Sequence, residues 1–418
     1  GHHALRPVRI SAWNFSYNNT GFGTWSIYTT AGEEHGNAEP TADGLALEQV
    51  ISSFGRVAAI AGVRTLSGIA LAGLFLGFLA DRLGRKRTIM LGLTLFALNS
   101  FLFAVGNQFL FFVGLLFISG LAIGVFKTGA LALIGDISTS TRSHTATMNT
   151  VEGFFGVGAI IGPAIVAQLL VRGASWKWLY VIAGGLCAIL IITAFFIRYP
   201  TRTQQVETVN LKASLSLMGH PHALAFSTLA MLYVGVEAAI YVWMPTLLAG
   251  YAGPWPLVAT YALAIFFVLR AGGRFLGAWL LSRFNWTTVM SLASGAILIC
   301  FVAAMVGGIS VAAIALPLSG LFMSVIYPTV NSKGISGFKK AQHGAAAGVI
   351  LFFTCVSAVL APLAMGAVSD LFGGAKAGFA LATVFAGLLF IALLANRIWD
   401  PSAKVLKSLD EDDYGAAP

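Results

Sequence analysis

The stretch GFLADRLGRKR, from Gly77 to Arg87, separates two long apolar runs, near residues 59–80 and 88–107. It places four basic residues in one short polar connection, namely Arg82, Arg85, Lys86 and Arg87. Connections of this kind lie on the cytoplasmic side of a membrane, where Lys and Arg accumulate. Asp81 precedes the second run, so its carboxylate can interact with the positive end of that helix, and Gly77 permits a close helix approach. The stretch therefore predicts an inner loop between two membrane-spanning helices.

The rest of the chain has the composition of a polytopic membrane protein. Of its 418 residues, 57% are hydrophobic and only 10% are charged, and the mean hydropathy is +0.84. A soluble domain carries about 25% charged residues. The apolar runs are close to the roughly 20 residues that a helix needs to cross a bilayer, whereas the strands of a membrane barrel are about half as long and alternate in polarity. The sequence therefore predicts an all-α membrane protein.

The apolar runs predict twelve transmembrane helices. The first, AWNFSYNNTGFGTWSIYTT, is uncharged but has little aliphatic character, so as a span it would line a water-filled cavity; the alternative is an interfacial or extramembrane segment. The predicted spans lie near residues 10–30, 59–80, 88–107, 109–133, 149–170, 176–197, 224–250, 257–281, 287–307, 309–331, 345–368 and 377–397.

A weak internal repeat divides these spans into two pseudo-symmetric halves. GLAIGVFKT at residues 120–128 matches GLFMSVIYPT at 320–329, and FFGVGAIIGP at 154–163 matches FFTCVSAVLAP at 352–362. Such a repeat is typical of secondary transporters that bind their solute between two halves. We expect an N-terminal six-helix half over 1–197, a cytoplasmic linker over 198–222, a C-terminal six-helix half over 223–400 and a cytoplasmic tail over 401–418.

The distribution of basic residues predicts the orientation. Most Lys and Arg fall in the connections that are inner if both termini are cytoplasmic, which accounts for the net charge of +9 without a nucleic-acid partner. We expect a monomer in the bilayer of a bacterial inner membrane. No nucleophile–base pair or metal-ligand cluster stands among the few polar residues of the spans, so we expect no enzymatic activity, no metal and no cofactor. No histidine lies within a predicted span, which disfavours a histidine proton relay.

The stretch at 77–87 resembles the loop 2–3 signature of the major facilitator superfamily, G-x-x-x-D-R-x-G-R-R-R. Gly77, Asp81, Arg82, Gly84, Arg85 and Arg87 occupy its key positions. An ordinary basic stop signal would explain the charges but not Gly77, Asp81 and Gly84. GVGAIIGP is similar to the glycine–proline motif of the family's fifth span, which makes Gly158, Gly162 and Pro163 a predicted pivot. The resemblance implies two halves that rock about a central site, with 77–87 as a gating motif.

Within that superfamily, LYVGVEAAIYVWMPTLL at 232–248 resembles the fucose/glucose permease-like branch. The sugar symporters of that branch couple to protons through acidic residues in spans 1 and 4. This chain has no acidic residue in its predicted first span, and Lys127 stands in span 4, in the region where those proteins place a glutamate. The departure disfavours a fucose-like coupling mechanism.

Ionisable residues in the middle of a span cost at least about 2.5 kcal/mol, so each is a candidate for function. We expect Lys127 to face the cavity and bind an anionic or hydroxyl-rich solute, with Arg274 as a second partner and Glu237 as the proton-coupling group. The alternative is that Lys127 pairs with Glu237 or Glu152 and only locks two helices, and that Arg274 organises the inner gate. Arg270 could face the same pore or another span.

Polar and aromatic side chains complete the predicted pocket, since amides bind hydroxyl groups and rings offer flat stacking surfaces. For Tyr241 the alternative is an interfacial aromatic belt. The substrate-binding residues that we predict beside Lys127 and Arg274 are Asn18, Asn19, Trp25, Tyr241, Tyr327 and Asn331.

The sequence predicts a secondary active transporter that moves a small polar solute by alternating access. An organic anion such as a sugar acid, or a sugar, fits the pocket, and proton-coupled symport is the default of the family. The alternatives are a drug or metabolite exporter of the same fold and a receptor that has lost transport.

Overall fold

The computed structural model describes residues 10–18, 22–29, 62–106, 108–200, 211–249 and 251–414. Within them, ten helices are long and apolar enough to cross a membrane. Over the described residues, each predicted span from 59–80 onward is confirmed as mainly helical, and the shorter helix Gly62–Leu76 with α2 (Leu79–Arg82) forms the first of these. The long helices are α3 (Arg85–Val105), α4 (Phe109–Ile137), α5 (Thr141–Val171), α6 (Lys177–Phe196), α8 (Pro221–Leu247), α10 (Ala262–Arg283), α11 (Trp286–Val306), α12 (Gly308–Met323) with α13 (Ile326–Ser336), α14 (His343–Phe372) and α15 (Ala375–Trp399).

The segment 10–30 is the exception. It forms two antiparallel strands, β1 (Ile10–Asn18) and β2 (Phe22–Thr29), so the structure corrects the helix predicted there. The physical reason is local. Aromatic and β-branched residues favour an extended backbone, and the intervening Asn-Thr-Gly has the composition of a turn. Helix propensity and aliphatic content are both low in this segment, so nothing in its sequence favours a buried helix.

Short elements connect the long helices. They are α7 (Leu211–Ser216), η1 (Leu217–Gly219), α9 (Pro256–Thr260), η2 (Lys340–Gln342), α16 (Ala403–Leu409) and η3 (Asp410–Tyr414).

The long helices differ in how much of their surface other helices cover. Along α6, Ile189, Ile192 and Phe195 are each about 60% exposed, whereas Tyr233 and Ile240 on α8 are fully buried. An exposed face of this kind, on an apolar helix, is the surface that lipid covers.

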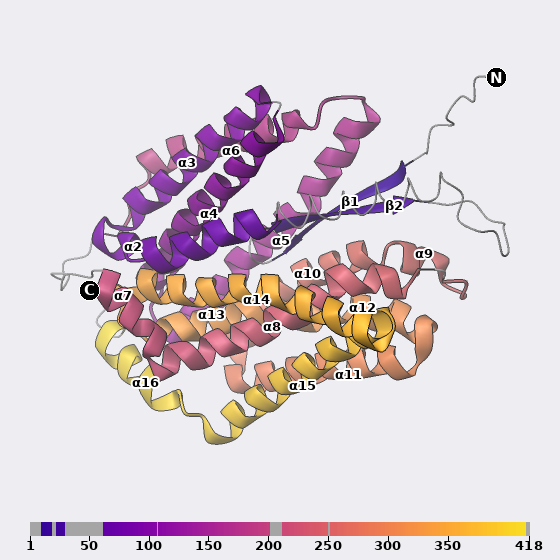
Figure 1. Cartoon of the computed structure of the whole chain (residues 1–418). Helices are drawn as coiled ribbons and strands as arrows, with labels where there is room; N and C mark the ends of the chain where they lie inside the picture. Colours follow the sequence, from indigo (N-terminus) through magenta and orange to yellow (C-terminus); the bar gives the residue numbers. More distant parts are fainter. Residues whose placement is uncertain are drawn as a thin grey trace.

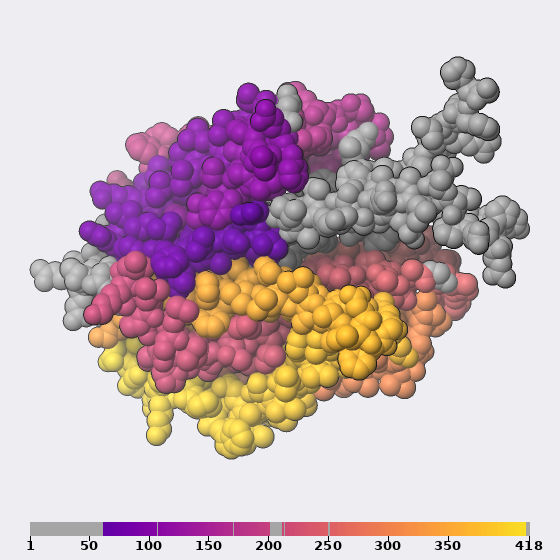
Figure 2. All heavy atoms as spheres, in the orientation of Figure 1, coloured from indigo at the N-terminus to yellow at the C-terminus, as the bar shows by residue number. Residues whose placement is uncertain are grey.

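The long helices form two groups (Figure 1). In the N-terminal group α3 packs on α4 and α6, and in the C-terminal group α8 packs on α14 and α15. The groups meet along a seam, where α5 packs on α10 and where α4 and α2 pack on α14. Figure 2 shows this seam as the line at which the indigo atoms meet the orange ones.

Glycines allow the close approach of the helix Gly62–Leu76 and α2 to α14. A Cβ on Gly73 would lie 2.9 Å from the carbonyl oxygen of Gly348. A Cβ on Gly344 would lie 2.7 Å from the carbonyl oxygen of Gly77 and 2.8 Å from the Cβ of Ala80. Backbone atoms cannot move aside as a flexible side chain can, so the seam needs residues without side chains at these positions.

The crossing at Gly344 should not tolerate an added methyl group. Because the added methyl meets backbone, Gly344→Ala should push α14 away from α2 and lower the free energy of unfolding by about 1–3 kcal/mol. Gly366→Ala on the same helix is the matched control, since its Cβ meets no atom of the described residues within 4 Å. Thermal unfolding of the purified variants checks the prediction. Equal midpoints for the two variants would show that the crossing is not tightly packed.

Candidate functional site

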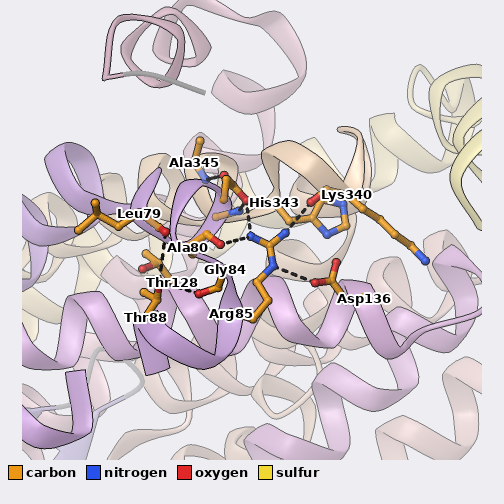
Figure 3. Close-up of polar contacts among 12 residues, drawn as sticks. Leu79, Ala80, Gly84, Arg85, Thr88, Thr128, Asp136, Lys340, His343 and Ala345 are labelled. Carbon is orange, nitrogen blue, oxygen red and sulfur yellow. Dashed lines mark hydrogen bonds and ion pairs between the residues drawn. The ribbon is translucent and has the colours of Figure 1, made fainter. Parts of the chain in front are cut away.

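Arg85 joins the two helix groups at one end of the bundle, which we call the Arg85 end (Figure 3). Its Nε donates to Asp136 Oδ2 at 2.9 Å, and its Nη1 donates to Asp81 Oδ1 at 2.5 Å and to the Ala80 carbonyl at 2.6 Å. Its Nη2 reaches across the seam and donates to the carbonyl oxygen of Lys340 at 2.7 Å. A planar guanidinium has its donors in a fixed fork, so one side chain can hold all four acceptors.

Asp81 makes a second connection across the seam. Its Oδ1 accepts the backbone N–H of Gly344 at 3.0 Å, and its Oδ2 accepts that of Ala345 at 2.9 Å. These groups belong to the first turn of α14, where free N–H groups and the helix dipole favour an anion. Burial raises the pKa of the Asp81 carboxyl, while the charge of Arg85 and these hydrogen bonds lower it. The ionised carboxylate thus depends on its partners.

The other motif residues of the 77–87 stretch do not take part through their side chains in the Arg85 hydrogen bonds. Gly84 has φ = +88°, a conformation that favours glycine, and it allows the sharp turn from α2 into α3. Arg82 and Arg87 are exposed and stand outside the Arg85 contacts. Gly77 lies at the close crossing with α14 described above.

A second cluster of ionisable residues lies in the middle of the bundle. On the C-terminal side, Arg270 of α10 forms an ion pair with Glu237 of α8 and donates to the hydroxyl of Tyr241. The Tyr241 hydroxyl in turn donates to Glu237 Oε1 at 2.6 Å. All three residues are buried, and the ring of Tyr241 stacks on Phe267 with centroids 5.6 Å apart. Tyr241 is therefore part of a buried network and not of an interfacial aromatic belt.

A second ion pair in the middle of the bundle crosses the seam. Arg274 of α10 lies one turn from Arg270; its Nη2 is 3.4 Å from Glu152 Oε2, and its Nη1 donates to the Glu152 carbonyl oxygen at 2.7 Å. The guanidinium is also 6.0 Å from the ring of Phe155. Glu152 and Phe155 belong to α5, so this pair joins the two helix groups beside the Glu237–Arg270 pair.

Lys127 lies next to this pair, on the neighbouring helix α4. Its Nζ is 5.9 Å from the ring centroid of Phe155 and 5.4 Å from that of Tyr327 on α13. The internal repeat aligns Lys127 with Tyr327, and the structure brings the two together. Tyr327 in turn lies 6.0 Å, ring to ring, from Tyr233 of α8. The sequence offered Glu237 as an alternative ion-pair partner of Lys127. In the structure Glu237 forms its ion pair with Arg270 instead.

Several predicted residues lie elsewhere. The side-chain amide nitrogen of Asn331 donates to the Tyr327 carbonyl oxygen at 3.0 Å. This hydrogen bond lies within α13. Asn18 and Trp25 fall on β1 and β2, whose side chains are not described, and Asn19 lies outside the described residues. The structure brings together Lys127, Arg274 and Tyr327, with Tyr241 and Glu237 in the adjoining network.

The predicted pivot is only partly a packing site. Pro163 lies inside α5, which continues unbroken from Thr141 to Val171. A Cβ on Gly158 or on Gly162 would meet no described atom within 4 Å. The tight position is Gly156, where a Cβ would lie 3.1 Å from that of Ala271 and 3.2 Å from Arg274 Nη1.

Two buried histidines lie outside the predicted spans. His144 on α5 and His343 on α14 are fully buried within helices that span, with ring centroids 5.7 Å apart across the seam. The predicted spans begin at 149 and 345, whereas the helices begin several residues earlier, so both histidines lie inside the helices. The spacing places Arg270 and Arg274 on one helix face, and Tyr233, Glu237 and Tyr241 on a face of another helix, but it carries no signal that these two faces meet.

Comparisons with known proteins agree with this arrangement. The family model described as "Major Facilitator Superfamily" matches residues 14–362. The chain is 27% identical to the L-fucose-proton symporter of Escherichia coli (strain K12), over 75% of this chain and 79% of that protein. It is 23% identical to a glucose/galactose transporter of Brucella abortus biovar 1 (strain 9-941), over 77% and 81%. A solved structure of the Escherichia coli fucose:proton symporter superimposes with a TM-score of 0.69 at 22% identity, covering 84% of this chain and 93% of that one. The family model covers most of the chain, and the chain therefore belongs to the major facilitator superfamily.

Proposed function

We propose that this chain is a proton-coupled symporter that carries a sugar or a sugar acid by alternating access. The observation that carries the proposal is the ionisable cluster at the seam: Lys127, Glu152, Glu237, Arg270 and Arg274 all stand in the middle of apolar helices. Each such residue costs at least about 2.5 kcal/mol, which a structural helix can avoid and a solute pathway cannot. Relatives named as sugar and fucose-proton transporters support the same assignment.

The cluster has the chemistry to hold a polyhydroxylated solute with a carboxylate. Among the described residues in the middle of the spans, three side chains are cationic (Lys127, Arg270, Arg274) and two are acidic (Glu152, Glu237), which leaves a net charge of +1. Lys127 is partly exposed, whereas the other four are buried. The rings of Phe155 and Tyr327 supply flat apolar faces beside Lys127, and the ring of Tyr233 lies next to that of Tyr327. An anionic group that binds Lys127 and Arg274 would neutralise the excess charge.

The Glu237–Arg270–Tyr241 network supplies a site for the coupled proton. Tyr241 and Arg270 both bind the Glu237 carboxylate, so protonation of Glu237 would remove the charge that holds Arg270 in place. Arg270 is one helical turn from Arg274, and a shift of this turn would act directly on the pair that crosses the seam. This is how a proton on one helix group would favour separation of the two.

We also propose which end of the bundle faces the cytoplasm. Basic residues cluster at the Arg85 end, so we place this end, the linker 198–222 and both termini in the cytoplasm of a bacterium with the chain in its inner membrane. The helix groups then correspond to halves 1–197 and 223–400, and the tail to 401–418. Arg85 and Asp81 close the end that we place in the cytoplasm, so we assign this state as outward-facing, and we propose that the protein is a monomer.

Uptake into proteoliposomes tests this function. Radiolabelled L-fucose, glucose, galactose and their acids (fuconate, gluconate, galacturonate) are offered with and without an imposed pH gradient, acidic outside. We expect at least one of these solutes to accumulate above its outer concentration only when the gradient is present. No uptake of any member, together with gradient-driven extrusion of an apolar dye, would instead identify an exporter.

The role of Lys127 gives a prediction of its own. A hydrogen bond to a charged group contributes about 1.5–3 kcal/mol, so Lys127→Ala should weaken binding of a solute carboxylate by about 10- to 150-fold. The neutral parent sugar should lose less affinity, because it has no carboxylate. Lys212→Ala, at an exposed position on α7, is the control. Binding measured by isothermal calorimetry decides: unchanged affinity for the acid in Lys127→Ala would remove Lys127 from the site.

A further inference from the structure

The last described residues of the chain lie across the Arg85 end of the bundle (Figure 1). After α15 the chain turns back into α16 and η3, a segment that we call the C-terminal latch (residues 403–414). Leu406, Leu409 and Tyr414 bury their side chains against the bundle. Four acidic residues, Asp410 to Asp413, follow the last of the helical leucines. The alternating burial of this short segment shows that it is docked and not simply a solvated tail.

Asp410 contacts the N-terminal helix group. Its Oδ1 accepts the backbone N–H of Thr141 at 2.6 Å, and its Oδ2 accepts the Thr141 hydroxyl at 2.8 Å. Thr141 is the first residue of α5, where N–H groups have no partner within the helix. A carboxylate is the preferred ligand at such a helix end, and here it comes from the far end of the chain.

Asp413 contacts the C-terminal helix group. Its Oδ2 accepts the backbone N–H of Lys340 at 2.6 Å, just before α14. The ammonium of Lys340 lies 4.3 Å from the ring centroid of Tyr414 and donates to the Ser138 carbonyl at 3.1 Å. One short acidic turn thus binds the first residue of α5 on one side of the seam and the connection before α14 on the other.

The two carboxylates have different mechanical roles. The latch is covalently attached to α15 and so moves with the C-terminal helix group. The Asp413–Lys340 contact can persist in any arrangement of the two groups, whereas the Asp410–Thr141 contact must break when α5 moves away. A cavity of about 380 Å³ remains beneath α16, lined among others by Arg142, Trp286 and Lys333. Packing beneath α16 is therefore incomplete, and the hydrogen bonds of the acidic turn add to the burial of Leu406, Leu409 and Tyr414 in holding the latch.

From this arrangement we propose that the C-terminal latch stabilises the state that is closed at the Arg85 end, with Asp410 as the contact that must release before the two helix groups separate there. The latch lowers the fraction of molecules that are open at the Arg85 end, and its release slows the opening step because the Asp410–Thr141 contact must break first. It acts in addition to Arg85 and Asp81, which connect the same two groups. Arg85 and the latch meet at Lys340, whose carbonyl oxygen accepts from Arg85 and whose N–H donates to Asp413. The inference holds whichever solute is carried, since no latch residue belongs to the mid-bundle cluster.

Hydrogen exchange of the full-length protein in nanodiscs, without solute, tests the latch. Asp410→Asn should speed exchange in a peptide covering the start of α5 about tenfold or more, because the charged acceptor of the Thr141 N–H is lost. Glu411→Gln is the matched control: it removes the same charge from the same turn, but its side chain is exposed. Exchange at wild-type rates in Asp410→Asn, or equal acceleration in both variants, would overturn the proposal.

A second measurement distinguishes a latch from a merely stabilising tail. A spin-label pair at the exposed residues Arg87 and Lys339 reports the separation of the two groups at the Arg85 end. Asp410→Asn should raise the population with the longer distance, and Glu411→Gln should not. If Asp410→Asn yields no folded protein, Thr141→Val removes the hydroxyl contact alone and should shift the population in the same direction. An unchanged distance distribution in the folded variants would contradict the latch even if their unfolding temperatures fell.

Discussion

Replacement of Glu237 with Gln should abolish accumulation driven by a pH gradient while downhill movement of the solute persists. The amide has the shape of a protonated carboxyl and can still accept a hydrogen bond from Tyr241, but it cannot take up or release a proton. With one proton per solute, a pH difference of one unit supports an accumulation ratio of about 10. We expect this ratio to fall to about 1 in Glu237→Gln.

The matched control for that experiment is Glu411→Gln, the same chemical change at an exposed carboxylate. It should accumulate solute as the wild type does. Accumulation measured in proteoliposomes at equal protein density separates coupling from expression. If Glu237→Gln concentrates the solute tenfold like the control, the proton binds elsewhere, and the Glu152–Arg274 pair becomes the next place to look.

Arg85→Ala should have the largest effect on stability. The substitution leaves the carboxylates of Asp81 and Asp136, whose side chains are 0% and 6% exposed, without their shared cation. Removal of one partner from a buried ion pair costs about 3–5 kcal/mol. Arg85 also binds the Lys340 carbonyl across the seam, so the variant should both unfold at lower temperature and favour opening at this end.

Arg87→Ala is the control for this variant, since Arg87 is exposed and two residues away on the same helix. Its unfolding midpoint should stay close to that of the wild type, whereas the midpoint of Arg85→Ala should fall by several degrees. Arg85→Lys should lie between them, because an ammonium keeps the charge but lacks the planar fork. Equal midpoints for the Arg85 and Arg87 variants would mean that the network does not hold the seam.

Much of the fold is local in the sequence and could be predicted. Runs of about 20 apolar residues define helices by their length, and the 77–87 stretch identifies the turn at which Asp81 and Arg85 act. The internal repeat placed Lys127 opposite Tyr327, and the two side chains do lie together. These features depend on residues close in sequence or on a repeat of nearly constant offset.

The features that could not be predicted depend on which helices pack together. Glu237 had Lys127 as a candidate partner, but α8 packs next to α10, which places Arg270 on its carboxylate. Asp410 reaches Thr141 over 269 residues of chain, a distance at which no periodic pattern gives a signal. The segment 10–30 lacked the aliphatic content of the other spans, and in the structure it pairs with itself as β1 and β2.

In the proposed cycle, the two helix groups separate at the Arg85 end when solute and protons bind. Distances between spin labels at Arg87 and Lys339, with Cys187, Cys300 and Cys355 replaced by alanine, measure this directly. We expect a short distance without solute and a second, longer population when a transported sugar or sugar acid is added at acidic pH. A single distance that changes with neither solute nor pH, in protein that still transports, would contradict it.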